Sequence, residues 1–189
     1  MAKVITGVCR FSYLNCWEPR AVEDGQKPKY SVSLIIPKSD KDTVSKIKAA
    51  IKEAYTDGEG VLKGTGKTVP AMDMIKIPLR DGDKERPEDP VYAGSYFVNA
   101  SSIQQPGVVD ARRQPIIDTS EMYSGVYGRA SINFYAFNKS GNRGIACGLQ
   151  NLQKIKDGDP LGGISRAEDD FNDGFSVETD DEDIDDLLG

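Results

Sequence analysis

The sequence predicts a mainly β domain: a small closed or half-closed barrel with one inserted α-helix, long loops and a disordered acidic C-terminal tail. Several separate stretches alternate apolar and polar residues at period two, which is typical of strands with one buried face. One stretch, residues 40–57, instead repeats its apolar residues at helical spacing. Residues 167–189 are rich in acids and poor in apolar residues. Such a segment can bury too little apolar surface to offset the conformational entropy that it would lose on folding.

The first two strands are expected near the N-terminus. Residues 1–14 alternate throughout and are predicted to form one strand. Residues 15–29 contain tryptophan, proline and glycine in close succession and are interpreted as a turn-rich connection. Residues 30–36 alternate again, and Pro37 ends this second strand because it cannot continue a ladder of backbone hydrogen bonds.

The inserted helix has clear start and stop signals. Ser39 or Asp40 is the candidate N-cap, and apolar side chains recur at helical spacing from Val44 to Tyr55. Gly58 follows the last apolar position and closes the helix. The chain from here to residue 94 is rich in glycine, proline and charge and is expected to form loops.

The remaining strands lie in the second half. Residues 96–102 form a short alternating stretch, and residues 125–138 form the strongest one. Residues 139–142 carry hairpin chemistry, so residues 143–152 are expected to return antiparallel to the preceding strand. Several strands, one helix and large loops suit an OB-fold-like barrel.

Composition excludes several classes of protein. The chain has no histidine, which removes His-based catalytic triads and His-containing zinc sites. Its three cysteines, Cys9, Cys16 and Cys147, are odd in number and scattered, so we expect free thiols and no metal or other cofactor. Because there is no signal-like segment and no apolar run that could span a bilayer, we expect an intracellular protein that is not bound to a membrane.

Charge divides the chain into two parts. The formal net charge is -6, which by itself argues against a nucleic-acid binder. However, all 24 basic residues lie in residues 1–166 with only 19 of the 30 acids, so this part carries +5. Residues 167–189 hold the other 11 acids. We therefore expect a binding domain over residues 1–166 and a separate acidic tail over residues 167–189.

Aromatic and basic residues are interleaved in the predicted strands. Rings can stack on unpaired bases while cations follow the phosphate backbone, so this combination favours single-strand binding. The candidate stacking residues are Phe11, Tyr13, Trp17, Tyr96 and Tyr127. The candidate phosphate-binding residues are Arg10, Arg112, Arg113, Arg129, Lys139 and Arg143. The alternative is core packing, because alternating rings in a barrel must place one face inside.

The end of the tail suggests a second role. Three apolar residues there share one face of a short helix among acids, which could dock on a partner protein. A tethered polyanion could also occupy a nucleic-acid groove as a phosphate mimic. The residues concerned are Asp180, Asp181, Glu182, Asp183, Ile184, Asp185, Asp186, Leu187 and Leu188.

These features occur together in a known family. Distinctive segments are the Arg10-Phe11-Ser12-Tyr13-Leu14-Asn15 run and residues 30–33, 36–40, 78–83, 92–100, 126–129, 151–154 and 157–163. In these segments the chain resembles the single-stranded-DNA-binding proteins of tailed bacteriophages, which have an OB fold and an acidic tail. The resemblance implies non-sequence-specific binding of single-stranded DNA in replication, recombination or repair, without enzymatic activity, in the cytoplasm of the infected host.

Partners follow from the same resemblance. We expect single-stranded DNA, duplex DNA once the tail is removed, replication or recombination proteins at the tail, and a homodimer. Better-known single-strand binders often end the tail in an aromatic residue, whereas here only Leu187 and Leu188 could substitute for it. The preference for DNA over RNA stays open.

Two other functions remain open. The chain could recruit replication enzymes through the tail while the body binds no DNA. It could also be a metal-dependent nuclease that uses carboxylates such as Asp73, Asp81 and Asp110.

Overall fold

A computed structural model describes residues 2–21 and 25–161. The strands are β1 Ala2–Ile5, β2 Cys9–Arg20, β3 Lys29–Pro37, β4 Leu79–Asp81, β5 Ser95–Ser102, β6 Gly107–Val109, β7 Tyr127–Lys139 and β8 Asn142–Lys156. The helices are α1 Lys41–Asp57, α2 Glu59–Lys63 and α3 Gly82–Glu85, with single turns η1 Met72–Met74, η2 Pro90–Tyr92 and η3 Thr119–Glu121. The predicted tail, residues 167–189, lies outside the described residues.

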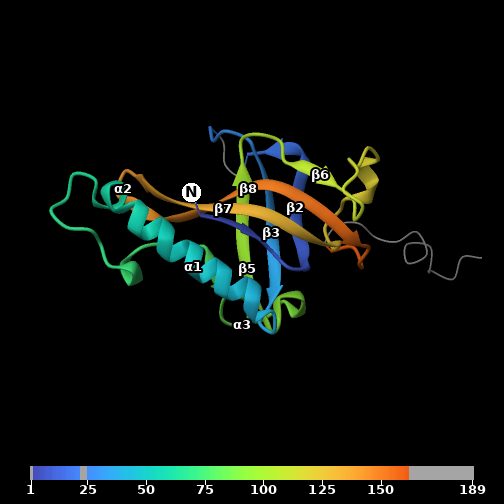
Figure 1. Ribbon diagram of the computed structural model, residues 1–189, viewed down its shortest axis with the longest axis horizontal. Helices are drawn as coiled ribbons and strands as arrows, with labels where there is room; N and C mark the ends of the chain where they lie inside the picture. The colour runs from blue at the N-terminus through green and yellow to red at the C-terminus, as the bar shows by residue number, and fades with distance from the viewer. Residues whose placement is uncertain (1, 22–24, 162–189) are drawn as a thin grey trace, which may run out of the picture.

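Five strands close into a barrel, whose arrangement can be followed in Figure 1. The ring runs β2-β3-β5-β8-β7, and β7 pairs with β2 to complete it. Neighbours in the ring are antiparallel except β5 and β8, which are parallel and pair only at Ser101 and Gly148. β1, β4 and β6 extend the sheet from β7, β5 and β8. The predicted OB-fold-like barrel is thereby confirmed.

The core fills the inside of this ring. Alternate side chains of β3, β5 and β7 point inward, and the largest include Leu34, Ile36, Phe134 and Ile132, none more than 1% exposed. The alternation in residues 125–138 therefore reflects one buried face of β7. α1 adds Ile47 and other apolar residues to the same core, so the helix covers the barrel next to β1 and β7.

α1 begins and ends where the sequence predicts. The Asp40 carboxylate accepts a hydrogen bond from the Thr43 backbone N–H at 3.2 Å and another from the Thr43 hydroxyl at 2.6 Å. This N-cap satisfies one of the backbone donors that a helix start leaves free. Gly58 follows the last helical residue, and its N–H donates to the Ala54 carbonyl.

The N-terminal strand differs from the prediction. Residues 1–14 do not form one strand, because the chain turns at residues 6–8 between β1 and β2. Thr6 is fully buried at this turn, where its backbone and hydroxyl both bond to Ala130 of β7. β2 then continues to Arg20, through much of the predicted turn region, because its end pairs with Lys29 of β3. This distant pairing overrides the local turn signals.

The β7–β8 hairpin is as predicted but longer. Ser140 and Gly141 both have positive φ, of 52° and 85°, as a two-residue turn between right-twisted strands requires. β8 runs on to Lys156, where it still pairs with Tyr127. The hairpin end reaches well beyond β5 (Figure 1). The barrel therefore carries a projecting two-stranded arm.

Candidate nucleic-acid interface

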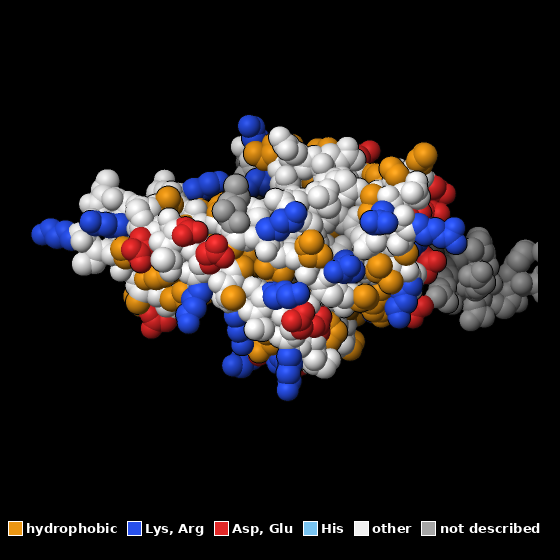
Figure 2. Space-filling model, in the orientation of Figure 1, with side chains coloured by type: hydrophobic (Ala, Val, Ile, Leu, Met, Phe, Trp, Pro, Cys, Tyr) orange, Lys and Arg blue, Asp and Glu red, His pale blue; other side chains and the backbone are white. Residues whose placement is uncertain are grey.

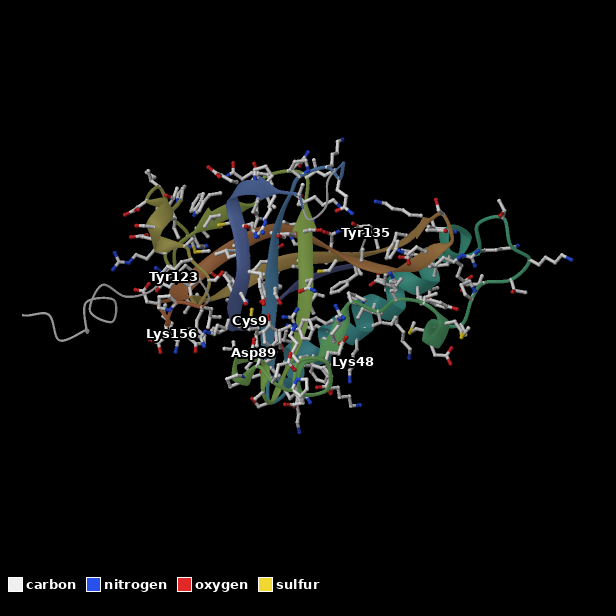
Figure 3. All side chains as sticks on the ribbon, turned by 180° about the vertical axis from the view of Figure 1, so that it is seen from behind. Cys9, Lys48, Asp89, Tyr123, Tyr135 and Lys156 are labelled. Atoms are coloured by element: carbon white, nitrogen blue, oxygen red, sulfur yellow. The ribbon has the colours of Figure 1, made fainter. Side chains whose placement is uncertain are left out.

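The outer face of β2, β3 and β5 carries small polar side chains. Cross-strand register places Ser31 of β3 between Asn15 of β2 and Ser101 of β5. These three are half-buried, and Asn99 beside them is exposed. Their neighbours along the strands point into the core, so the polar face is the outside of the barrel. Figure 3 views the molecule from this side.

Two adjoining hollows cross this face. The first, about 390 Å³, is lined by β2 residues including Tyr13 and Asn15 and by Asp89 and Val91 opposite them. The second, about 530 Å³, is lined by Ser31, Ser101 and the loop before β3. Arg20 lines both hollows, so they form one track. We call the residues lining these two hollows the groove.

Four cations converge on one end of the groove. They come from three places in the sequence: the end of β2, the start of β3 with the loop before it, and the tip of the β7–β8 hairpin. In OB folds the face of the second and third barrel strands and the two flanking loops bind oligonucleotides. Within the described residues, none of the four is in an ion pair. They are Arg20, Lys27, Lys29 and Lys139.

An exposed ring marks the other end. Tyr13 is 60% exposed and has a positive φ of 47°, a conformation that costs energy for a residue with a side chain. The Arg86 guanidinium lies 5.5 Å from the Tyr13 ring and 4.7 Å from the Tyr92 ring. Arg86 also donates to the Tyr13 hydroxyl at 3.5 Å. A ring and a cation are thus held together beside the first hollow.

A second group of rings and cations lies near Leu161, the last described residue. The Tyr127 ring has the Arg10 guanidinium 5.3 Å from its centre and the Lys156 ammonium 4.8 Å from it. Arg10 is also fixed by donating to the carbonyls of Gly125 at 3.2 Å and Asp159 at 2.7 Å. Lys156 and the neighbouring Tyr123 lie at the same end of the molecule in Figure 3.

Tyr123 belongs to this end as well. Its hydroxyl donates to the Asp157 carboxylate at 2.9 Å, and Lys154 lies 2.7 Å from the same carboxylate. Burial and the Asp157 charge raise the pKa of Tyr123, whereas the hydrogen bond from Lys154 lowers the pKa of Asp157. These bonds hold the segment that leads to the tail against β8.

Tyr96 lies elsewhere, beside α1. The ammonium groups of Lys38 and Lys48 approach its ring at 5.2 and 5.8 Å. Lys38 is also paired with Asp81 at 2.9 Å and Asp83 at 2.8 Å. Hydrogen bonding to Asp83 and Asp81 raises the pKa of Lys38, and the same bonds lower the pKa values of both carboxyls.

The α1 side is less suited to a phosphate backbone than the groove. Asp81 and Asp83 offset the charge of Lys38, and Asp42 pairs with Lys46 at 3.0 Å. Figure 2 shows acidic side chains interspersed with the lysines on this face. A polyanion approaching α1 would therefore meet repulsion as well as attraction.

Comparison with known proteins identifies the family. A family model described as the single-stranded-DNA-binding protein of Enterobacter phage Enc34 matches residues 2–186. The chain belongs to this family. Protein p50 of Acyrthosiphon pisum secondary endosymbiont phage 1 is 30% identical over 164 residues, which cover 84% of this chain and 87% of that protein.

Solved structures agree with this assignment. The Enc34 protein in complex with single-stranded DNA has a TM-score of 0.68 and 28% identity, covering 85% of this chain and 90% of its own. The gp2.5 single-stranded-DNA-binding protein of bacteriophage T7 has a TM-score of 0.61 at 12% identity, covering 88% of this chain and 98% of its own. The T7 likeness supports the fold alone.

The structure corrects one predicted stacking residue. Phe11 is fully buried and packs against Gly128, where an added Cβ would lie 2.9 Å from the ring. It is part of the barrel core and has no face left for a base. Trp17 is half-buried against the same core, and its indole N–H is buried without a hydrogen-bond partner among the described residues.

The predicted cations are not gathered at one place. Lys139 joins the groove and Arg10 joins Tyr127, as described. Arg112 and Arg113 are exposed in the turn after β6, which Asp110 holds by accepting from the backbone N–H of Arg112. Arg129 is exposed on β7 and donates to the Thr6 carbonyl at 3.0 Å. Arg143 is half-buried on β8, at the hairpin.

Sequence reasoning missed several groove residues. Arg20, Lys27 and Lys29 lay in the stretch interpreted as a turn-rich connection, so their convergence with Lys139 was not foreseen. Alternating serines in residues 30–36 were a usable signal, because small polar residues facing out of a barrel leave room for a ligand. Arg86 could not have been found from the sequence, since its ring partners come from distant elements.

The carboxylates considered for a nuclease are not clustered. Asp81 is paired with Lys38, Asp110 holds the turn after β6, and Asp73 is in η1. Among the described residues, no group of three or more His, Cys, Asp or Glu side chains could hold a metal ion. No helix in the described part of the chain is long and apolar enough to cross a membrane.

Proposed function

We propose that the chain binds single-stranded DNA without sequence preference, and that the groove holds the strand. The observation that carries the proposal is the combination along one track: Tyr13 and Arg86 at one end, small polar side chains in the middle and four cations at the other end. Base stacking supplies affinity for any sequence, because every base has a π-face. The family and the DNA complex of the Enc34 protein support this proposal.

The shape of the groove explains the expected lack of base preference. Ser31 and Ser101 have short hydroxyl side chains that can donate or accept and that adapt by rotation. Reading a base requires a rigid pattern of donors and acceptors at its edge. These serines offer no such pattern, whereas the four cations would contact phosphates, which are the same in every nucleotide.

The remaining rings and cations extend the proposed site. Tyr127 with Arg10 and Lys156 lies beyond the Tyr13 end of the groove, and Tyr96 lies on the α1 side. Arg112, Arg113, Arg129 and Arg143 would contribute through the overall attraction of a basic body for DNA. Tyr13, Tyr127 and Lys139 are the predicted residues best placed for direct contact.

The acidic tail is proposed to compete with DNA. Leu161 lines the first hollow, and its backbone N–H donates to the Ser124 carbonyl at 2.8 Å. Residues 162–189 therefore start beside the groove, and a chain of this length can extend to roughly 90 Å. Tethered acids at this point would compete with phosphates for the same cations. Removing them would tighten binding to single strands and permit binding to duplex DNA.

Cellular role and partners belong to the same proposal. A protein that covers single strands without sequence preference would act in phage DNA replication, recombination or repair, in the cytoplasm of the infected host, as a binding protein and not an enzyme. The tail would recruit replication or recombination proteins. A homodimer would arise if one chain's tail occupied the groove of a second copy.

The decisive test is a salt-titrated binding curve. Labelled single- and double-stranded oligonucleotides are titrated with the full chain and with residues 1–166, and binding is followed by fluorescence anisotropy. We expect binding to single strands, weakening as salt rises, and tighter binding by residues 1–166. If residues 1–166 bind no single strand at low salt, the chain is instead an interaction module that acts through its tail. Cleavage of the oligonucleotide in the presence of Mg²⁺ would contradict a purely binding role.

A further inference from the structure

A third hollow opens where the barrel is least tightly closed. β5 and β8 pair only at Ser101 and Gly148, so the two strands diverge after this point. The cleft between them has a volume of about 720 Å³. Its lining combines apolar surface with uncharged polar side chains, among them Gln104, Gln105 and Gln150. This cleft adjoins the groove defined above.

The cleft is continuous with the basic end of the groove. Lys29, Ser101 and Ile103 line both the second hollow and the third. Ile103 is 57% exposed at this junction and offers an apolar surface to a sugar or a base. A strand that leaves the groove past Lys29 would therefore enter the cleft without crossing a ridge of side chains.

Tyr135 lines the far side of the cleft and is partly exposed there. It is 40% exposed and lies on the face of β7 opposite to the core residues Phe134 and Ile132. The register places Ala146 directly across from it on β8, with Gly144 and Gly148 as the diagonal neighbours. No β8 neighbour on this face is larger than a methyl group, so nothing on β8 covers the ring.

The face of the sheet that carries Tyr135 also carries a basic residue on the neighbouring strand β1. Lys3 of β1 is exposed and pairs with Asn133 of β7, two residues before Tyr135 on the same face. α1 packs against the opposite face of these strands, where its end at Gly58 meets Ala136. Figure 3 shows Tyr135 between β5 and the end of the β7–β8 hairpin.

We propose that single-stranded DNA continues from the groove into the cleft between β5 and β8 and that Tyr135 stacks on one of its bases. The inference rests on the proposed function, because it assigns a further part of the same DNA path. It makes the hairpin arm a binding element and adds Tyr135, absent from the predicted site, to the residues that contact DNA. The uncharged amides of Gln104, Gln105 and Gln150 would form hydrogen bonds with the DNA backbone and with base edges.

The experiment compares affinity as a function of oligonucleotide length. Oligo-dT of increasing length is titrated with the full chain and with Tyr135→Ala, Tyr135→Phe and Ala146→Leu. Short strands that fill only the groove should bind Tyr135→Ala as they bind the native chain. For strands long enough to reach the cleft, Tyr135→Ala should bind about 5- to 150-fold more weakly. Tyr135→Phe should bind normally, because it keeps the ring.

Two further measurements separate stacking from structural damage. Ala146→Leu keeps Tyr135 but fills the space beside its ring, so it should weaken only the long strands as well. A long strand containing 5-iodouracil should crosslink to Tyr135 on irradiation, as mapped by mass spectrometry. A cooperative thermal unfolding transition near that of the native chain is the control that each variant is folded.

The outcomes distinguish the two proposals. If Tyr135→Ala and Ala146→Leu bind long strands normally while Tyr13→Ala binds them weakly, the cleft proposal is wrong and the groove stands. If Tyr135→Ala weakens every length equally, the cleft is not a continuation of the path, and the proposal is overturned. If substitutions at Tyr13 and Lys29 change nothing at any length, the proposed function itself fails.

Discussion

Removing charge from the basic end of the groove gives a quantitative prediction. Lys29 and Lys139 are two of the four cations there, and they lie 110 residues apart in the sequence. Each phosphate that a cation neutralises on a single strand contributes about 0.7 to the slope of log affinity against log salt concentration. Four such contacts contribute about 2.8, and Lys29→Ala with Lys139→Ala reduces this to about 1.4. Other cations that contact DNA add the same amount to the slope of the native chain and to that of the double variant. The difference of about 1.4 between the two slopes should therefore be unchanged.

The effect is large enough to measure. Between roughly 50 and 200 mM salt, a slope of about 2.8 corresponds to an affinity loss of about 50-fold, and a slope of about 1.4 to about 7-fold. Fluorescence anisotropy with labelled oligo-dT at several salt concentrations gives both slopes. The variant should also bind less tightly than the native chain at the lowest salt, where phosphate contacts count most.

A matched control keeps the change in net charge the same. Lys46 and Lys52 are exposed on α1, and replacing both with alanine also removes two charges. If binding depended only on overall charge, the two double variants would behave alike. We expect the α1 variant to keep a slope near that of the native chain. Equal slopes for the two double variants, or an unchanged slope for Lys29→Ala with Lys139→Ala, would refute a specific role of the groove.

Further outcomes follow from single features of the structure. Tyr13→Ala should weaken binding of single strands by about 1–3 kcal/mol while Tyr13→Phe retains most affinity, and equal titration curves for Ala and native chains would remove Tyr13 from the site. Trp17 fluorescence should be quenched by bound oligo-dT; an unchanged signal at saturation would show that the half-buried indole does not meet DNA. Residues 1–166 should bind oligo-dT more tightly than the full chain at low salt, and identical affinities would contradict competition by the tail. Burial raises the pKa of the Cys9 thiol from 9.0 to about 12, so the neutral thiol's contribution to stability is present below pH 9 and is lost as pH rises toward 12. Chemical denaturation between pH 7 and pH 11 measures this loss, and rapid alkylation of Cys9 in the native protein at pH 8 would contradict the burial.

Much of the fold could be predicted because its signals are local. The Asp40 cap, the apolar stripe of α1 and the hairpin turn at Ser140 and Gly141 all act within a few residues. The break between β1 and β2 could not be predicted, because the buried Thr6 makes its hydrogen bonds to Ala130, which is more than a hundred residues away. The continuation of β2 to Arg20 could not be predicted either, because it depends on pairing with Lys29 of the next strand.

The candidate site was predicted less completely. Tyr13, Tyr127 and Lys139 were identified by residue type, and the structure places them in or beside hollows. Phe11 follows the same alternating pattern as Tyr13 but faces the core. The regular geometry of β2 is interrupted after Phe11. The backbone at Tyr13 adopts a positive φ, and the pairing of β2 with β3 shifts register after Ser12. An irregularity of this kind changes which face later side chains occupy, and alternation alone does not reveal it.

The sequence by itself determined the class of fold, the helix, the hairpin and the separation of a basic body from an acidic tail, because periodicity, capping and charge are properties of neighbouring residues. Only the tertiary structure decided which rings are buried, how Arg20, Lys29 and Lys139 meet at one end of a groove, and that the seam between β5 and β8 opens beside Tyr135. Barrel closure joins strands that are far apart in the chain. The surfaces that it creates therefore depend on register and on which strands pair, and neither is a property of any single segment.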